Sequence, residues 1–144
     1  MQGEANAIEP GKRILSSMTP TILLDSMGRV KLVTGTGGGP TIITTISQII
    51  SNVVDFDMDI GNATGAPRLH HQHLPDVLYY ERKGLRPDVD SALRALGYNV
   101  EARAGYQGDT QSIVVLTNGT LAGVADPRFG GAAVGVRELR QVVH

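Results

Sequence analysis

A glycine-rich segment between an apolar strand and an apolar helix is the feature that most constrains this fold. Residues 34–40 read Thr-Gly-Thr-Gly-Gly-Gly-Pro and directly follow the apolar run 30–33. Proline suits a first helical turn, because its missing N–H has no acceptor there. The segment after Pro40 carries apolar residues at spacings of three and four, which predicts a helix buried along one face: Ile42, Ile43, Ile46, Ile49, Ile50, Val53 and Val54.

The glycine turn offers backbone N–H groups at the start of this predicted helix. Unpaired amides and the helix dipole favour negative charge at such a position. No Lys-Ser or Lys-Thr pair follows the last glycine, and the G-x-G-x-x-G spacing fails, so neither phosphate-binding fingerprint is present. Spacing alone leaves two alternatives open, a plain strand-to-helix turn and an anion-binding turn.

The remaining elements alternate short strands with short helices. Turn residues separate apolar runs throughout, and Asn118-Gly119 is a strong hairpin signal. These patterns predict one α+β domain over residues 1–144, with a charged tail at 137–144 that is expected to fray. The expected strands are 21–24, 30–33, 78–80, 99–102 (at a sheet edge), 113–116 and 121–125, and further helices are expected within 57–67 and 87–96.

Composition excludes several classes of function. The 144 residues have a net charge of −1 and only 4% aromatic residues, which argues against nucleic-acid binding. The chain has no cysteine, which excludes disulfides, thiolate catalysis and zinc–thiolate sites. No stretch approaches the roughly 20 apolar residues of a membrane span. The polar, acidic N-terminus is unlike a signal peptide, so we expect either a cytosolic protein or a chain that begins downstream of a signal.

Adjacent hydroxyls at Ser16 and Ser17 precede the first predicted strand. No G-x-S-x-G elbow surrounds them, which argues against a nucleophile. Serine pairs in this position usually cap a turn or face solvent. Two adjacent hydroxyls can also donate to a ligand carboxylate, and spacing does not choose between these interpretations.

Three histidines, His70, His71 and His73, lie within five residues. On a strand, His71 and His73 would share one face, where metal binding is conceivable. No cysteine is nearby and the closest carboxylate lies beyond a proline, so hydrogen-bonded histidines are favoured. We therefore predict no metal site and no cofactor.

Five strings follow one another along the chain: Lys12–Ile22, Thr34–Pro40 continued by Ile42–Thr44, Ala66–Gln72 continued by Leu74–Asp76, Asp109–Ile113 and Ala125–Arg128. Together they resemble the small subunit of the γ-glutamyltranspeptidases, and the resemblance runs from about Gly3 to Val136. It implies part of the αββα sandwich of an N-terminal-nucleophile hydrolase, in which two antiparallel sheets stack between helical layers. It also implies an acyltransferase or hydrolase reaction, in which a threonine freed by self-cleavage attacks a γ-glutamyl amide.

The resemblance also implies roles for four residues. Ser16 and Ser17 would bind the α-carboxylate of the γ-glutamyl donor, and Gly38 and Gly39 would form the oxyanion hole through their backbone N–H groups. The family's nucleophilic threonine lies upstream of the serines, and we expect no nucleophile in this chain. We thus expect a fragment equivalent to the C-terminal portion of the small subunit, inactive alone.

Its expected partners are a donor such as glutathione, together with the large subunit and the N-terminal part of the small subunit, or a homodimer partner. The family suggests a periplasmic or extracellular location. The alternative is a non-catalytic domain that binds a small amino-acid-like ligand or serves as an interaction module.

Overall fold

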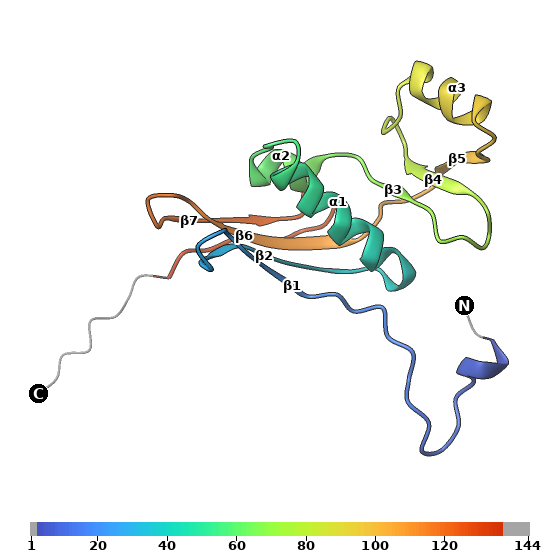
Figure 1. Ribbon diagram of the computed structural model, residues 1–144, viewed down its shortest axis with the longest axis horizontal. Helices are drawn as coiled ribbons and strands as arrows, with labels where there is room; N and C mark the ends of the chain where they lie inside the picture. Colours follow the sequence, from blue (N-terminus) through green and yellow to red (C-terminus); the bar gives the residue numbers. More distant parts are fainter. Residues whose placement is uncertain (1–2, 137–144) are drawn as a thin grey trace, which may run out of the picture.

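Two β-sheets organise the computed structural model, which describes residues 3–136 (Figure 1). The larger sheet has the order β1-β2-β6-β7 and is antiparallel throughout, whereas the smaller has the order β3-β4-β5. The predicted fraying of the tail lies outside the described residues. The strands are β1 (Thr21–Leu24), β2 (Val30–Gly37), β3 (Leu69–His70), β4 (Leu78–Glu81), β5 (Val100–Arg103), β6 (Asp109–Val115) and β7 (Leu121–Ala125).

Helices cover one face of the larger sheet. Both α1 (Ile42–Val54) and α2 (Ile60–Gly65) pack there, while α3 (Pro87–Ala95) lies beside the smaller sheet (Figure 1). Short 3₁₀ turns form at η1 (Glu4–Asn6) and at η2 (Gly39–Thr41), which leads directly into α1. Among residues 3–136, no helix has the length and apolar character needed to cross a membrane.

The core lies between α1, α2 and β2. Five residues form its fully buried centre, Leu32, Ile49, Val53, Ile60 and Ala63. Because α1 is rich in β-branched residues with modest helix propensity, its stability depends on this tertiary burial.

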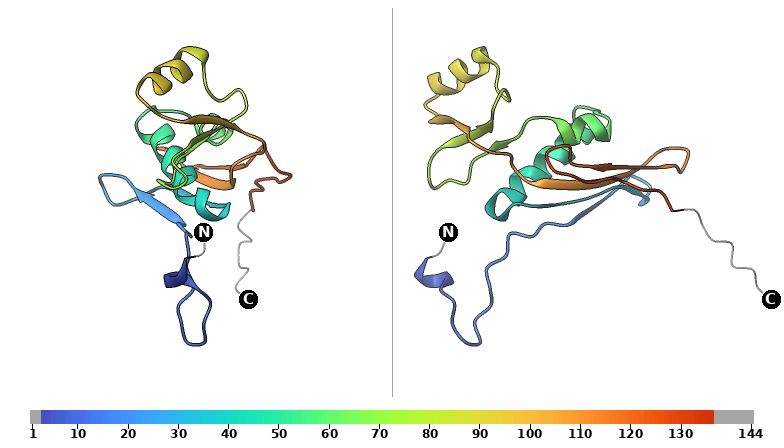
Figure 2. Two further views of the ribbon diagram at one scale, coloured as in Figure 1. Left: turned by 90° about the vertical axis from the view of Figure 1, so that its right-hand side faces the viewer. Right: turned by 180° about the vertical axis from the view of Figure 1, so that it is seen from behind.

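The opposite face of the larger sheet is apolar and open. Ile22 pairs with Val33, and Val33 pairs with Ile113, so these three side chains form a row across β1, β2 and β6. All three are exposed. Figure 2 shows α1 and α2 together on the other side of this sheet. We call this row the outer apolar face.

The structure confirms most predicted elements and corrects the extent of several. Strand β2 runs to Gly37 and β6 begins at Asp109, because polar residues such as Thr36 and Thr110 pair between distant segments. Helix α2 is shorter than predicted, and β3 was missed because it has only two residues. Strand β5 lies at a sheet edge as expected, but it is parallel to β4 because α3 forms the crossover between them.

Candidate functional site

The glycine turn joins the end of β2 to the start of α1. Gly38 and Gly39 have φ angles of 136° and 58°, in the region that favours glycine. A Cβ atom on Gly38 would lie 2.7 Å from Thr41 Oγ1, so no larger residue fits without a shift. The turn is closed by the Thr41 hydroxyl, which donates to the Gly38 carbonyl at 2.9 Å.

The amides of this turn are available to a ligand. Within residues 3–136, the N–H groups of Gly38 and Gly39 have no protein acceptor, and both residues are exposed. Gly38 immediately precedes η2, Gly39 is the first residue of η2, and η2 leads into the 13-residue helix α1. Free amides at such a position suit a carboxylate or a developing oxyanion.

Ser17 contacts the glycine turn directly. Its hydroxyl donates to the Gly39 carbonyl at 2.6 Å, across 22 residues of sequence. Ser16 is exposed, and its Oγ accepts the Met18 amide at 3.2 Å, which is the local turn contact expected of serine pairs. The fold therefore brings both serines and both glycines to one edge of the molecule.

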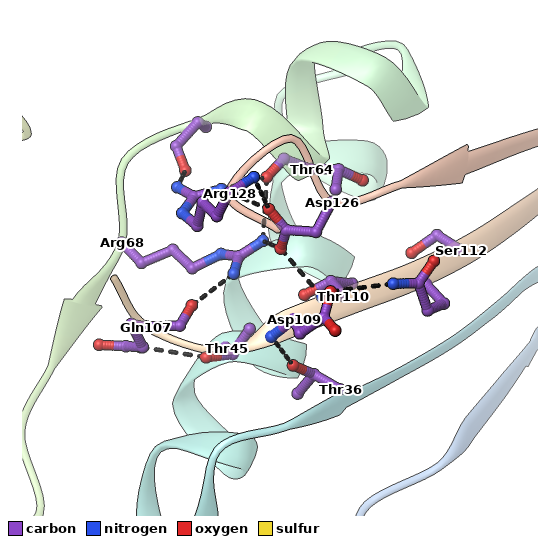
Figure 3. Close-up of polar contacts among 12 residues, drawn as sticks. Thr36, Thr45, Thr64, Arg68, Gln107, Asp109, Thr110, Ser112, Asp126 and Arg128 are labelled. Atoms are coloured by element: carbon purple, nitrogen blue, oxygen red, sulfur yellow. Dashed lines mark hydrogen bonds and ion pairs between the residues drawn. The ribbon is translucent and has the colours of Figure 1, made fainter. Parts of the chain in front are cut away.

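A second glycine segment supports the turn from behind. Gly108 has a φ of 73°, and a Cβ there would lie 2.7 Å from Thr36 Oγ1 and 3.1 Å from Thr45 Cγ2. A Cβ on Gly38 would lie 3.4 Å from the Gly108 Cα. Thr36 Oγ1 also accepts the Asp109 amide at 2.8 Å (Figure 3). The turn thus packs backbone against backbone on this segment.

Four charged side chains, each at most 6% exposed, hold that supporting segment in place, and Figure 3 labels three of them, Arg68, Asp126 and Arg128. Arg68 Nη2 contacts Asp126 Oδ2 at 2.7 Å, and Arg128 contacts Asp126 Oδ1 at 3.1 Å and Glu81 Oε2 at 2.5 Å. Arg68 also donates to the Gln107 carbonyl, while Glu81 Oε1 accepts the Gln107 amide at 2.8 Å. This ionic cluster, Arg68, Glu81, Asp126 and Arg128, therefore fixes the residue next to Gly108.

Both carboxylates of the ionic cluster are stabilised as anions. Burial raises the pKa of the Asp126 carboxyl, but hydrogen bonds from the backbone amides of Thr110 and Arg128 outweigh it. The Arg68 guanidinium acts in the same direction, so the pKa of Asp126 lies below its usual range. For Glu81, burial is likewise outweighed, chiefly by the hydrogen bond from Arg128, and its pKa is also lowered. The cluster holds two cations and two anions and is neutral as a unit.

Sequence reasoning missed the ionic cluster. Arg68, Asp126 and Arg128 occur in the strings that carry the family resemblance, but nothing local gave them a role. The sequence did offer one signal: Arg68 in one string and Asp126 in another carry opposite charges and lie about 60 residues apart. Buried ion pairing between them depends on long-range contacts.

The rings of His70 and His71 are hydrogen-bonded, as favoured above, whereas His73 contributes its backbone amide, which lies 3.3 Å from His71 Nδ1. His70 is buried, with Nδ1 at 2.9 Å from Thr44 Oγ1 and Nε2 at 2.9 Å from Gln72 Oε1. His71 Nε2 lies 3.0 Å from Asp76 Oδ1. In the part of the chain that the structure describes, no group of three or more His, Cys, Asp or Glu residues could hold a metal ion.

Comparisons with known proteins match the whole described chain. The family model for gamma-glutamyltranspeptidase matches residues 1–136. A glutathione hydrolase proenzyme of Escherichia coli K12 is 48% identical over 126 residues, which are 88% of this chain and 21% of that protein. A second, from Pseudomonas aeruginosa, is 43% identical over 136 residues, 93% of this chain and 24% of that protein. The chain thus spans between a fifth and a quarter of these relatives' length.

Solved structures show the same fold. An acivicin-inhibited gamma-glutamyltranspeptidase matches with a TM-score of 0.82 and 48% identity, over 88% of this chain and 68% of that one. The enzyme of Pseudomonas nitroreducens in complex with L-DON matches with a TM-score of 0.83 and 43% identity, over 94% and 70%. The α+β architecture is therefore part of the N-terminal-nucleophile hydrolase fold. Since the family model, the sequence relatives and the fold agree, the chain belongs to the γ-glutamyltranspeptidase family.

Proposed function

We propose that this chain forms the substrate-holding part of a site for γ-glutamyl transfer or hydrolysis. Ser16 and Ser17 bind the α-carboxylate of a donor such as glutathione, and the amides of Gly38 and Gly39 stabilise the oxyanion. The contact that carries this proposal is the 2.6 Å hydrogen bond from Ser17 to Gly39, because it joins the two segments at one place. The names of the sequence relatives, glutathione hydrolase proenzymes, support the substrate class.

In the proposed reaction, a hydroxyl attacks the γ-carbonyl carbon and loses its proton to a base. The carbonyl electron pair moves to oxygen, where the glycine amides donate hydrogen bonds that stabilise the negative charge. Collapse of this intermediate releases the protonated amine and leaves an acyl-enzyme. Water or an acceptor amine then takes the glutamyl group. In both acylation and deacylation, the two serines orient the γ-glutamyl group and the two glycine amides stabilise the oxyanion.

The attacking group is expected to come from outside these residues. Thr44 and Thr45 form a threonine pair, but both lie within α1, where their α-nitrogens are peptide-bonded. Thr45 is 0% exposed, and the Thr44 hydroxyl contacts the Thr41 carbonyl and His70. Neither has a free amine to act as base, so we propose that the chain alone is inactive and works as a fragment of a larger assembly.

The outer apolar face supports this view of a fragment. One face of an antiparallel sheet can be solvated, but it is then usually polar. Here Ile22, Val33 and Ile113 form a contiguous exposed row. An apolar face of this kind favours burial against another sheet, as in a sandwich. We propose that the missing parts of the small and large subunits pack here, with a second copy of the chain as the alternative occupant.

The alternative function is ligand binding without turnover. It is favoured by the free glycine amides and the Ser17 contact, which form without any nucleophile. Such a domain would bind glutamate and leave γ-glutamyl amides intact in every context.

A chimaera distinguishes the two functions. The matching segment of the E. coli relative is replaced by this chain, and release of p-nitroaniline from a γ-glutamyl anilide is followed with and without glycylglycine. We expect activity from the chimaera and none from the isolated chain. A Gly39→Pro chimaera, which has no N–H at residue 39, should lose about 10²-fold or more in kcat. Ser17→Ala should raise KM. A chimaera that matures but shows no turnover would support the non-catalytic alternative, and turnover by the isolated chain would refute the fragment proposal.

A further inference from the structure

A cavity of about 400 Å³ lies beside the glycine turn, between the start of α1 and the smaller sheet. Pro40 and Thr41, which directly follow Gly39, form one wall. His70, Tyr79 and Arg103, from the three strands of the smaller sheet, also line it. This volume is in the range of sites for small molecules and is sufficient for an amino acid or a dipeptide.

Arg103 gives the cavity an uncompensated positive charge. It is half-buried at the end of β5, and within residues 3–136 no carboxylate or other acceptor pairs with its guanidinium. The buried guanidiniums of Arg68 and Arg128, by contrast, both contact carboxylates. Among residues 3–136, no acidic side chain lines the cavity. A partly desolvated guanidinium without a counter-ion favours a carboxylate, whose two oxygens match its planar donors.

The other polar groups of the wall define what the cavity can recognise. Both ring nitrogens of His70 are engaged by Thr44 and Gln72, so this ring is a fixed part of the wall. The half-buried Tyr79 hydroxyl has no partner among the described residues and is a second donor. The Arg103 guanidinium offers donors only, and the Tyr79 hydroxyl can donate as well as accept, so both can bind an anionic ligand.

We propose that this cavity binds the free carboxylate of an amino acid or short peptide through Arg103. The inference rests on the proposed function, because the cavity matters for acyl transfer only if the glycine turn beside it binds the oxyanion. In acyl transfer, the amine that leaves and the amine that accepts occupy the same side of the carbonyl. A carboxylate held by Arg103 would orient that amine toward the acyl group. The cavity is thereby assigned to the part of the substrate beyond the γ-glutamyl amide.

The test is a titration of the ¹⁵N-labelled full chain with glycylglycine, and separately with glycylglycine amide, which lacks only the carboxylate charge. We expect shifts of the Thr41, Arg103 and Ala104 amides with the acid, and binding about tenfold or more weaker with the amide. Arg103→Gln should weaken glycylglycine binding to the same extent, whereas Arg103→Lys should retain part of it. Arg82→Gln, an exposed cation outside this cavity, is the matched control and should bind as the unaltered chain does.

Equal binding of the acid and the amide would overturn the proposal, as would unaltered glycylglycine binding by folded Arg103→Gln. A parallel titration with L-glutamate reports on the donor site through the amides of Gly38 and Ser17. A glutamate response there without any glycylglycine response at Arg103 would reject the cavity and leave the proposed function intact. Shifts at Arg103 without a glutamate response at Gly38 would support the cavity and count against the donor role.

Discussion

Arg128 contacts two buried carboxylates at once, and this geometry determines what its removal costs. A buried ion pair is weak evidence for net stability, because desolvation offsets much of the attraction. Removing one partner is different, since the remaining charges stay buried without compensation. Glu81 and Asp126 would both lose a cation, while the Arg68 guanidinium forms an ion pair with Asp126 and not with Glu81.

We therefore expect Arg128→Met to lower the free energy of unfolding by about 3–5 kcal/mol. Urea denaturation followed by circular dichroism measures this change. Arg29→Met is the matched control, because Arg29 pairs with Asp25 at the surface, and a much smaller change is expected. If both variants lost the same unfolding free energy, the destabilisation would not depend on the burial of the ion pair.

The same carboxylates predict how stability depends on pH. The folded-state pKa values of Asp126 and Glu81 are lowered, so the unfolded chain binds more protons than the folded chain in acid. Their contribution is fully present above the unfolded pKa of about 4 and is lost as pH falls through the folded values. We expect the urea midpoint to fall steadily below about pH 4. Asp126→Asn, measured in the same way, should be less stable at neutral pH and lose less on acidification.

The glycine turn and the segment behind it form a contact between two loops. Gly108 and Gly119 both have positive φ, 73° and 83°, but only Gly108 is crowded, since Gly119 has open space around it. Gly119→Ala should therefore cost about 1–2 kcal/mol of unfolding free energy from backbone strain alone. Gly108→Ala should cost more and should shift the Gly38 amide in a ¹H–¹⁵N spectrum. Similar costs with no shift at Gly38 would contradict the supporting role of Gly108.

Local sequence patterns predicted which helices and strands form near this turn, but they did not predict how far the strands pair with one another. Helix α1 and the hairpin of β6 and β7 follow from apolar spacing and from Asn118-Gly119. The extension of β2 to Gly37 was not predictable in this way, because its partners in β6 are polar and lie more than 70 residues away. The position of Ser17 and the ionic cluster depend on the same long-range pairing. The roles proposed for Ser16, Ser17, Gly38 and Gly39 came from the family resemblance and not from local pattern.

Only one face of the larger sheet is covered by helices. This difference between the two faces bears on how the chain assembles with other chains or segments. Its inner face packs on α1 and α2, whereas Ile22, Val33 and Ile113 stay exposed on the outer apolar face. If this face packs against another sheet, a charge placed on it should affect assembly far more than folding.

Two isoleucines of similar exposure allow a controlled test of that idea. Ile113 on the outer apolar face is 43% exposed, and Ile43 on α1 is 53% exposed. In the isolated chain, both Ile113→Lys and Ile43→Lys should change the unfolding free energy by no more than about 0.5–1 kcal/mol, because neither side chain is buried. In the chimaera with the E. coli relative, Ile113→Lys should abolish assembly and anilide hydrolysis, since a lysine would be buried between two sheets without a partner. Ile43→Lys should leave both close to the unaltered chimaera. Size-exclusion chromatography and the anilide assay measure the two effects, and normal assembly of Ile113→Lys would show that the outer apolar face is not the interface.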